Sequence, residues 1–492
     1  MPRLTAATLD QANSGVATPP YDRAGLVTGI AHFGMGGFHR AHQALMIDEL
    51  LRRGEAREWA ITGIGVRPED SRMRAALGEQ DGLYTLIEKH ADGAQDARVI
   101  GSILGMLTLA DDGAEAVLEL LSTPTTRIVS LTVTEGGYNI NQSTGEFLID
   151  APDVVADLAE GAMPRTVFGL IVEALRRRRE AGTTPFTVMS CDNLPDNGRV
   201  AHRSILAFAE AKDPELAAWI DAEVAFPNSM VDRITPATTD ADRRSALELT
   251  GLEDAWPVVC ETFFQWVLQD SFVNGRPPYE LARVELVDDV EPYEMMKLRL
   301  LNSSHQGLCY FGYLLGYRFV ADATSDPLIS GLLRNYIGRE AIPTLRPIGG
   351  VDPAEYGETC ISRFRNPQVG DTVARLCAES SDRIPKWLLP VVFDLLAEGR
   401  SVDFSAAIVA SWARYARGVD EQGEPIEVVD NRREQVMAAA APSDDPLAFI
   451  RDPELFGDLA ERPEFTEPYL YALTALNERG ARALLTELAE RA

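Results

Sequence analysis

The sequence is poor in cysteine and in positive charge, and it contains no long apolar run. Its 492 residues include five widely spaced cysteines and no Cys-x-x-Cys pair, which argues against a disulfide framework and against a thiolate zinc site. No uninterrupted apolar stretch approaches the roughly 18 residues that span a bilayer, and the N-terminal residues lack the apolar core of a signal peptide. We therefore expect a cytoplasmic protein with reduced thiols and no membrane contact.

The charge balance is strongly acidic. Asp and Glu number 75 against 46 Lys and Arg, which gives a formal net charge of -29. Such a chain repels nucleic acid and anionic membranes and does not steer anionic substrates toward itself. Its one basic run, Arg176 to Arg179, follows an apolar helical stripe and precedes a glycine. This pattern indicates a solvated helix end rather than a phosphate-binding patch.

The length and the pattern of apolar residues predict more than one domain. In the first half, strand-like runs alternate with helical patterns, which is typical of an α/β fold with a parallel sheet. From about Pro292 onward, helical patterns dominate. We predict an α/β N-terminal domain over residues 1–288 and a mostly α-helical C-terminal domain over 289–492. The expected strands are 29–33, 59–66, 128–133 and 186–190; the expected helices are 293–315, 371–379, 386–398, 404–417 and 432–441; the expected loops are 349–358 and 442–446.

A glycine-rich turn follows the first expected strand. It contains Gly34, Gly36, Gly37 and Phe38 and opens a predicted helix that runs through Leu51. Glycines in such a turn let the backbone approach a pyrophosphate, and the helix N-terminus supplies amide donors. The third glycine of the usual fingerprint is replaced by His39, so a tight turn without a ligand stays an alternative to a dinucleotide site.

Two acidic residues follow the second expected strand. A dinucleotide-binding fold places a carboxylate there to bond the adenosine ribose, and Glu69 and Asp70 occupy this place. Their charge disfavours a 2′-phosphate and indicates NAD. Arg67 and Arg72 lie close by in the sequence and keep NADP as an alternative.

Two further strand ends carry polar residues. Thr134 and Glu135 follow the third expected strand, and Asn193 follows the fourth. Ligands of open α/β sheets bind beyond the carboxyl ends of the strands, so these residues are placed to reach one. Ordinary turn chemistry is the alternative role.

The segment from Glu294 to His305 collects polar groups on an apolar helical pattern. At about 100° per residue, Lys297, Glu294, His305 and Asn302 fall near 0°, 60°, 80° and 140°, on one side of the predicted helix. Burying such groups without partners costs roughly 1–3 kcal/mol each. Either a reactive site or a solvated helix face accounts for the pattern.

The sequence contains no recognisable set of metal ligands and no hydrolase motif. His39 and His42 are spaced i, i+3, but no third ligand with recognisable spacing follows. No Gly-x-Ser-x-Gly elbow is present, and Ser303 and Ser304 are only sequence neighbours of His305. We expect no bound metal.

Taken together, these motifs resemble the mannitol dehydrogenase family, the long-chain polyol dehydrogenases that include fructuronate reductases and arabinitol dehydrogenases. The core Val231-Asp232-Arg233-Ile234 is the most specific match. The resemblance extends through nearly the whole chain, over residues 34–42, 134–138, 190–194, 226–236 and 297–305.

The resemblance implies a Rossmann-type N-terminal domain, a mostly helical C-terminal domain and zinc-independent hydride transfer between NAD(H) and a sugar alcohol or its ketose. It implies Lys297 as general acid/base, Asn193 and Asn302 as donors to the reacting oxygen, and His305 as a substrate contact. Glu294 resembles the family's proton-channel gate. The resemblance also implies cofactor contacts at Val231 and Asp232 and cationic substrate contacts at Arg375 and Arg383, with Lys386 competing for the second of these.

A lysine base needs help from its surroundings. A free lysine has a pKa of about 10.4, so its ammonium form must be disfavoured before it can take a proton near neutral pH. Apolar neighbours and a positive nicotinamide ring would both disfavour it. Two amide donors would stabilise the developing alkoxide.

The substrate is less determined than the chemistry. The acidic composition favours a neutral polyol, whereas Arg375, Arg383 and Lys386 could bind a uronate carboxylate. We rank D-mannitol and D-fructose first, arabinitol or another polyol second, and fructuronate third. A non-catalytic NAD-binding sensor is the alternative from another class, but it would not need Lys297 and Asn302. We expect a monomer or a weak homo-oligomer.

Overall fold

The protein consists of two compact units, Met1–Val290 and Glu291–Ala492. The computed structural model describes residues 1–141 and 145–491. The first unit contains three sheets and the helices that cover them. The described residues of the second unit form helices and connecting loops, with no strand among them. The predicted fold class, an α/β domain followed by a helical domain, is confirmed.

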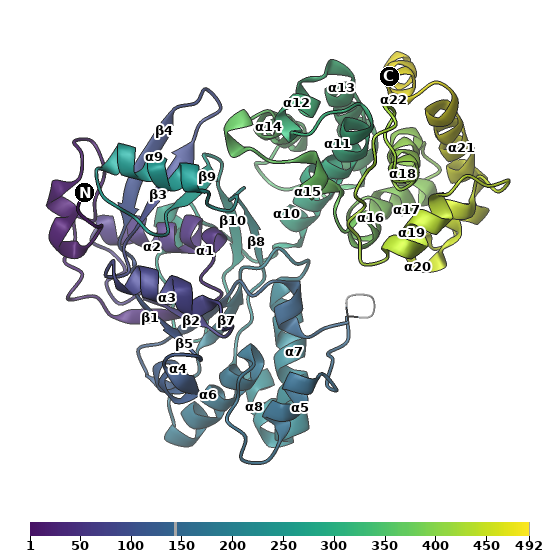
Figure 1. Ribbon diagram of the computed structural model, residues 1–492. Helices are drawn as coiled ribbons and strands as arrows, with labels where there is room; N and C mark the ends of the chain where they lie inside the picture. Colours follow the sequence, from purple (N-terminus) through teal and green to yellow (C-terminus); the bar gives the residue numbers. More distant parts are fainter. Residues whose placement is uncertain (142–144, 492) are drawn as a thin grey trace. The chain divides into compact units, whose positions relative to one another are not determined.

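A parallel sheet forms the centre of the first unit (Figure 1). Its strand order is β5-β2-β1-β6-β7, and every neighbouring pair is parallel. All four predicted strands lie in it, and the fifth, β5, was missed because Gly105 and partly exposed residues interrupt its apolar pattern. The bounds are β1 Thr28–Phe33, β2 Ala60–Gly65, β5 Ile103–Thr108, β6 Ile128–Leu131 and β7 Thr187–Ser190.

The strand order fixes where a ligand can bind. From β1 the chain goes to β2 and β5 on one side, and later to β6 and β7 on the other. The order therefore reverses between β1 and β6, and ligands of open α/β sheets bind beyond the carboxyl ends of the strands at this switch point. The glycine turn follows β1, and the loop of Thr134 follows β6.

Both faces of the sheet are covered, as is usual for parallel sheets. Ile30 and Ile128 face the helix α2 (Gln43–Arg52). Ala31 and Val129, one residue further along each strand, face the opposite layer. That layer contains α4 (Gly113–Ser122), α6 (Val167–Ala181) and α7 (Asn197–Lys212).

Two small sheets complete the first unit. The order of one is β4-β3-β9, and that of the other is β11-β10-β8. Neither sheet is among the strands predicted from the sequence. Their bounds are β3 Tyr84–Lys89, β4 Gln95–Ile100, β9 Val258–Glu261, β8 Ser229–Asp232, β10 Gln265–Gln269 and β11 Glu285–Val287.

The basic run ends helix α6, as predicted, but the prediction that the run is solvated is wrong for Arg178. Arg178 is buried and donates hydrogen bonds to the carbonyl oxygens of Leu121, Thr126 and Thr184. Gly182 ends the helix in the left-handed conformation with φ of 67°. The other cations of the run therefore belong to a helix end, where positive charge is favourable.

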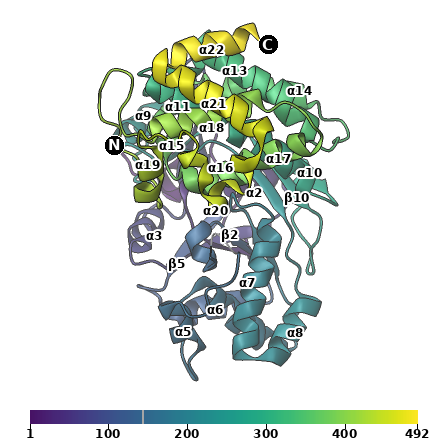
Figure 2. The same ribbon diagram turned by 90° about the vertical axis from the view of Figure 1, so that its right-hand side faces the viewer.

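The second unit packs its helices around α11 (Ser303–Leu314), whose residues 303–312 are all buried. Figure 2 shows α18 (Asp403–Tyr415) and α21 (Pro463–Glu478) side by side, in agreement with their contacts. The helices predicted at 371–379, 386–398, 404–417 and 432–441 correspond to α15 (Val373–Cys377), α17 (Leu389–Ala397), α18 and α19 (Arg433–Ala440). Within the described ranges, none of the helices is long and apolar enough to cross a membrane.

One predicted loop is wrong in this unit. Residues 353–358 of the expected loop 349–358 belong to α14 (Pro353–Phe364). Pro353 occupies the first helical turn, where its missing N–H costs nothing, and Asp352 caps the helix by accepting a hydrogen bond from Ala354. Pro353 therefore begins a helix inside the segment that was predicted to be a loop.

Candidate active site

Gly34 makes the tight turn after β1 possible. Its φ is 92°, and a Cβ at this position would lie 2.0 Å from the carbonyl oxygen of Thr132. Only glycine fits this conformation and this contact without strain. A Cβ at Gly36 would meet only the Gly34 carbonyl oxygen, at 3.8 Å, so the space beside Gly36 is open.

Two stacked imidazoles replace the missing third glycine. His39 lies over His32 of β1, with ring centroids 3.4 Å apart. Burial lowers the pKa of His32 to about 3, and burial together with the neighbouring His32 lowers the pKa of His39 well below its usual value. Two neutral rings can stack without charge repulsion. The close packing of helix and strand that a third glycine usually permits is made here by aromatic contact.

The predicted single helix through Leu51 is wrong, because it breaks at His42. The two parts are α1 (Gly37–Ala41) and α2. His42 has φ of -123° and ψ of -94°, outside the helical range. At the break, the Tyr84 hydroxyl donates to the carbonyl oxygen of Arg40 at 2.5 Å, and Arg233 donates to that of Ala41 at 2.7 Å. Groups from distant segments thus bind carbonyl oxygens beside the break.

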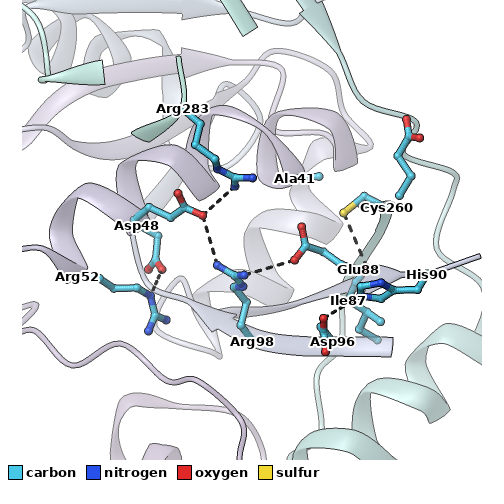
Figure 3. A network of polar contacts seen from close by, with 12 residues as sticks. Ala41, Asp48, Arg52, Ile87, Glu88, His90, Asp96, Arg98, Cys260 and Arg283 are labelled. Carbon is cyan, nitrogen blue, oxygen red and sulfur yellow. Dashed lines mark hydrogen bonds and ion pairs between the residues drawn. The ribbon is translucent and has the colours of Figure 1, made fainter. Parts of the chain in front are cut away.

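Arg233 connects the glycine-turn helix to the small sheet β4-β3-β9. Besides Ala41, its guanidinium donates to the Glu261 carbonyl oxygen at 2.9 and 3.1 Å and pairs with the Glu88 carboxylate. Figure 3 shows how Glu88 also faces Arg98 of β4, at 3.4 Å. The Arg233 side chain is fully buried. In the sequence, Arg233 is recognisable only as part of a motif, and no neighbouring residue indicates these partners.

The acidic pair after β2 begins helix α3 (Asp70–Gly78). Asp70 accepts a hydrogen bond from the backbone N–H of Arg67 at 2.9 Å. A Cβ at Gly65, the last residue of β2, would lie 2.5 Å from the Cβ of Asp70. The glycine therefore lets the carboxylate lie against the end of the strand, and Glu69 beside it is exposed.

The loop after β6 is held by a carboxylate that sequence reasoning missed. Asp192 accepts hydrogen bonds from the backbone N–H groups of Val133 and Thr134, at 3.1 and 2.8 Å, and from the Tyr138 hydroxyl, at 2.7 Å. Thr134 has φ of 63° and ψ of 171°, a conformation almost restricted to glycine. Strained backbone of this kind concentrates at ligand sites, where surrounding bonds maintain it.

The segment after β7 lies against β8. Asn197 exchanges hydrogen bonds with the backbone of Ser229, and its amide also donates to the Asp192 carbonyl oxygen. These bonds fix both ends of the short turn that contains the exposed Asn193, and in β8 Val231 and Asp232 are buried. The structure thus joins several predicted site segments of the first unit through Asp192 and Asn197.

The segment of Lys297 is not a regular α-helix, so the helical wheel used to place its side chains is wrong there. Residues Lys297–Asn302 form a π-helix, η4, between α10 (Glu291–Met296) and α11. Its last turn is closed by the N–H of Ser303, which bonds the carbonyl oxygen of Leu298, five residues earlier. Each π-turn contains more residues than an α-turn, which changes the angle between Lys297 and Asn302. Such bulges are frequent at functional sites.

A second π-helix, η5 (Tyr336–Ala341), packs on the first. The Tyr336 hydroxyl donates to the Arg299 carbonyl oxygen at 3.1 Å. Arg299 itself donates to Thr344 at 2.9 Å and to Asp394 at 2.7 Å. Side chains from other helices therefore hold η4 in place.

The polar groups of this helix are buried. Lys297 is 6% exposed, Asn302 4% and His305 9%, which excludes a solvated helix face for these three. Within the part of the chain that the structure describes, Nδ2 of Asn302 and Nε2 of His305 are buried without a hydrogen-bond partner. An unsatisfied buried donor costs roughly 1–3 kcal/mol, and a bound polar ligand removes that cost. Glu294, one turn before Lys297, is half-buried.

His305 is neutral in this environment. Burial first, and then the positive charge of Arg375, lowers its pKa to about 3. Its ring also lies against Phe364, with centroids 4.6 Å apart. It can therefore exchange a hydrogen bond with a ligand near neutral pH, but it does not change charge there.

The two predicted cationic contacts have partners within the second unit. Arg375 on α15 is exposed and forms a two-bond pair with Asp371. Arg383 on α16 (Ser380–Trp387) donates to the carbonyl oxygens of Arg375 and Leu376, and it lies over the Trp387 ring. The competing Lys386 is exposed on the same helix. Among the residues described, no group of three or more His, Cys, Asp or Glu side chains is arranged to hold a metal.

Two family models match the chain in succession. The mannitol dehydrogenase Rossmann domain matches residues 28–281, and the mannitol dehydrogenase C-terminal domain matches residues 289–477. The fold and these matches define a protein with a Rossmann domain followed by a helical domain. The chain belongs to the mannitol dehydrogenase family, which confirms the resemblance found in the sequence.

Individual relatives match over nearly their full length. A mannitol 2-dehydrogenase of Phaeosphaeria nodorum is 43% identical over 99% of this chain and 86% of its own. One of Cereibacter sphaeroides is 44% identical over 96% of this chain and 98% of its own.

Two solved structures have the same fold. The Pseudomonas fluorescens mannitol 2-dehydrogenase, in a ternary complex with NAD and D-mannitol, is 44% identical with a TM-score of 0.89, and each chain is covered completely. A substrate-free D-sorbitol dehydrogenase is 39% identical with a TM-score of 0.92, over 98% of this chain and 100% of its own.

Proposed function

We propose that this protein is an NAD-dependent polyol dehydrogenase that oxidises D-mannitol to D-fructose without zinc, with Lys297 as the general base. The observation that carries the proposal is the buried set of Lys297, Asn302 and His305 on a π-helical bulge and the helix that follows it, with two side-chain nitrogens, Nδ2 of Asn302 and Nε2 of His305, that lack partners in the described structure. The mannitol 2-dehydrogenase relatives support the substrate, and the NAD in the Pseudomonas fluorescens complex supports the cofactor.

In the proposed reaction, Lys297 transfers the proton, and Asn302 and Asn193 stabilise the reacting oxygen. When bound, the nicotinamide accepts the hydride that leaves the alcohol carbon. Lys297 takes the hydroxyl proton as neutral amine, and its burial disfavours the ammonium form. Asn302 and Asn193 donate hydrogen bonds to the developing alkoxide, and such donors do not change their own charge. In the reverse direction the Lys297 ammonium returns the proton to the ketose oxygen.

The remaining site residues of the second unit position the substrate and the proton. The neutral His305 ring bonds a substrate hydroxyl through Nε2. Glu294, one turn before the base, passes the proton toward solvent. Arg375 and Arg383 contact the far end of the substrate.

The first unit provides the groups that would hold NAD. The open space at Gly36 and the N-terminus of α1 suit the pyrophosphate, while Glu69 and Asp70 suit the adenosine ribose. Gly34, Gly37 and Phe38 shape the turn, and Thr134, Val231 and Asp232 lie on the segments at the switch point. Residues 1–288 would thus bind the cofactor and supply Asn193, and residues 289–492 would supply the other substrate contacts, in a cytoplasmic monomer or weak homo-oligomer.

A substrate panel tests the proposal. NADH absorbance would be followed with mannitol, arabinitol, sorbitol, fructose and fructuronate, with NAD and NADP compared. We expect the highest kcat/KM for mannitol and fructose. The sorbitol dehydrogenase of the same fold makes another polyol the second candidate. Activity on fructuronate alone would identify a hexuronate reductase, and NAD binding without turnover of any polyol would indicate a sensor.

Replacing Gly36 with alanine tests whether the glycine turn binds the cofactor. The added methyl group meets open space in the protein, so the fold should be unchanged, but it would occupy the place of the pyrophosphate. We expect the Kd for NAD to rise at least about tenfold with little change in melting temperature. Gly34→Ala should instead lower the melting temperature, because its Cβ meets the Thr132 carbonyl. Gly105→Ala, in open space on β5, is the matched control. Unaltered NAD binding by Gly36→Ala would place the cofactor elsewhere.

Replacing Asp70 with alanine tests the choice of cofactor. The change removes a ribose acceptor and a charge that repels a 2′-phosphate, so kcat/KM should fall with NAD and rise with NADP. The ratio of the two values is the measurement. An unchanged ratio would move the selectivity to Glu69 or Arg67.

A further inference from the structure

Arg375, the proposed contact to the far end of the substrate, is already paired within its own unit. Its Nε and Nη2 atoms each lie 2.6 Å from a carboxylate oxygen of Asp371, one turn earlier. This is the two-bond geometry in which a guanidinium also binds a carboxylate ligand. A substrate carboxylate that used the same edge would have to displace Asp371.

Asp371 is held firmly in that position. Its side chain is only 11% exposed, whereas that of Arg375 is 55% exposed. The backbone N–H of Thr372 donates to its carboxylate at 2.9 Å, and the N–H of Val320 donates to its carbonyl oxygen at 3.0 Å. Moving the Asp371 carboxylate away would therefore disturb the Thr372 bond as well as the ion pair.

The pair lies close enough to His305 to act on it. After burial, the charges of Arg375 and then Asp371 have the largest influence on the pKa of the His305 ring, in opposite directions. Helix α15, which carries Arg375, packs directly on α11, which carries His305. Arg363 and Arg383 also influence the ring, and Arg383 is bonded to two backbone carbonyl oxygens. Of the charged groups that most influence the His305 ring, Asp371 is the acidic one, and Arg375, Arg363 and Arg383 are basic.

We infer that Asp371 is a specificity-determining residue: by binding the Nε and Nη2 edge of Arg375, it suits the site to a neutral polyol or ketose and excludes hexuronate anions. The inference rests on the proposed function and names the chemical class that the site rejects. Rejection follows because an anion would meet the Asp371 charge and find the favourable edge of Arg375 occupied. Specificity against a competitor is often built from such a repulsive element.

The test compares NADH-dependent reduction of D-fructose and D-fructuronate by the wild-type protein and by Asp371→Asn. For wild type, we expect kcat/KM for fructose to exceed that for fructuronate at least about a hundredfold. The variant removes the charge and frees the guanidinium edge, so this ratio should fall at least about tenfold, mainly through a lower KM for fructuronate. A ratio within twofold of wild type would overturn the inference, as would a wild-type protein that prefers fructuronate.

Asp458→Asn is the matched control. Asp458 forms the same i,i+4 two-bond pair with Arg462, on another part of the second unit, at 2.9 and 2.7 Å. Removal of the Asp458 charge should leave the ratio of kcat/KM for fructose to kcat/KM for fructuronate unchanged. An equal fall of this ratio in both variants would show a general charge effect and overturn the inference. Melting temperatures establish that both variants fold, and Asp371→Ser replaces Asp371→Asn if the latter does not fold. A wild-type protein inactive on every polyol would contradict the proposed function instead.

Discussion

Lys297→Ala is expected to lower kcat for mannitol oxidation by about three orders of magnitude or more, with little change in NADH binding. Positioned proton transfer contributes about 10²–10⁴-fold, and the buried amine also organises the neighbouring donors. Steady-state kinetics give kcat, and NADH fluorescence titration gives the Kd. An exogenous small amine should restore part of the activity, because it can take the proton in the space that the side chain leaves.

Two further variants separate base catalysis from charge. Lys297→Arg keeps a positive charge but cannot become neutral near pH 7, since arginine stays protonated. It should therefore be nearly as inactive as Lys297→Ala. Lys212→Ala, which removes a lysine bonded to the Asp157 carbonyl in the first unit, should keep wild-type activity. Full activity of Lys297→Arg would exclude the general-base role.

Asn302→Ala should cut kcat by about 10²–10³-fold, the loss seen when one oxyanion-hole donor is removed. The reason is that Nδ2 of Asn302 is buried without a partner in the described structure and is free to meet charge on the reacting oxygen. Mannitol KM should change much less than kcat, because the alkoxide charge develops only in the transition state. Asn477→Ala, at an exposed position of α21, is the control.

A chelation experiment, read together with the Asn302→Ala kinetics, tests metal independence. Without a zinc ion, the amide donors must stabilise the oxygen, so activity should survive exhaustive chelation. Activity lost on chelation and restored by zinc, together with a nearly silent Asn302→Ala, would overturn the proposed chemistry while leaving the fold intact.

Local patterns were enough to predict much of the fold. The strands 29–33, 59–66, 128–133 and 186–190 are recognisable because apolar, β-branched runs bounded by turn residues are encoded within a few positions. The same holds for the end of α6 and for the change to helices near Pro292. The loop predicted at 349–358 is wrong from residue 353 onward, because Pro353 lies in the first turn of a helix, where proline is tolerated.

The candidate site was predicted less evenly. Its residue types were visible in the sequence, since an amine, two amides and an imidazole within recognisable motifs suggest their chemistry. Their arrangement was not visible. The π-helix at Lys297–Asn302 depends on contacts of Arg299 and Tyr336, which a helical wheel cannot include. Likewise, nothing in the sequence distinguishes the indispensable Gly34 from Gly36, because the difference is the distance to Thr132 across the sheet.

The sequence by itself therefore determined the family, the order of the two domains and the chemical groups available for catalysis. The tertiary structure decided which of those groups are buried, unpartnered or already paired. Asp192 and Arg233 show why: each acts through partners that the fold brings to it, Thr134 for Asp192 and Ala41 for Arg233. Propensities and turn chemistry act over a few neighbouring residues, whereas the hydrogen bonds of a buried charge are chosen only when distant segments pack together.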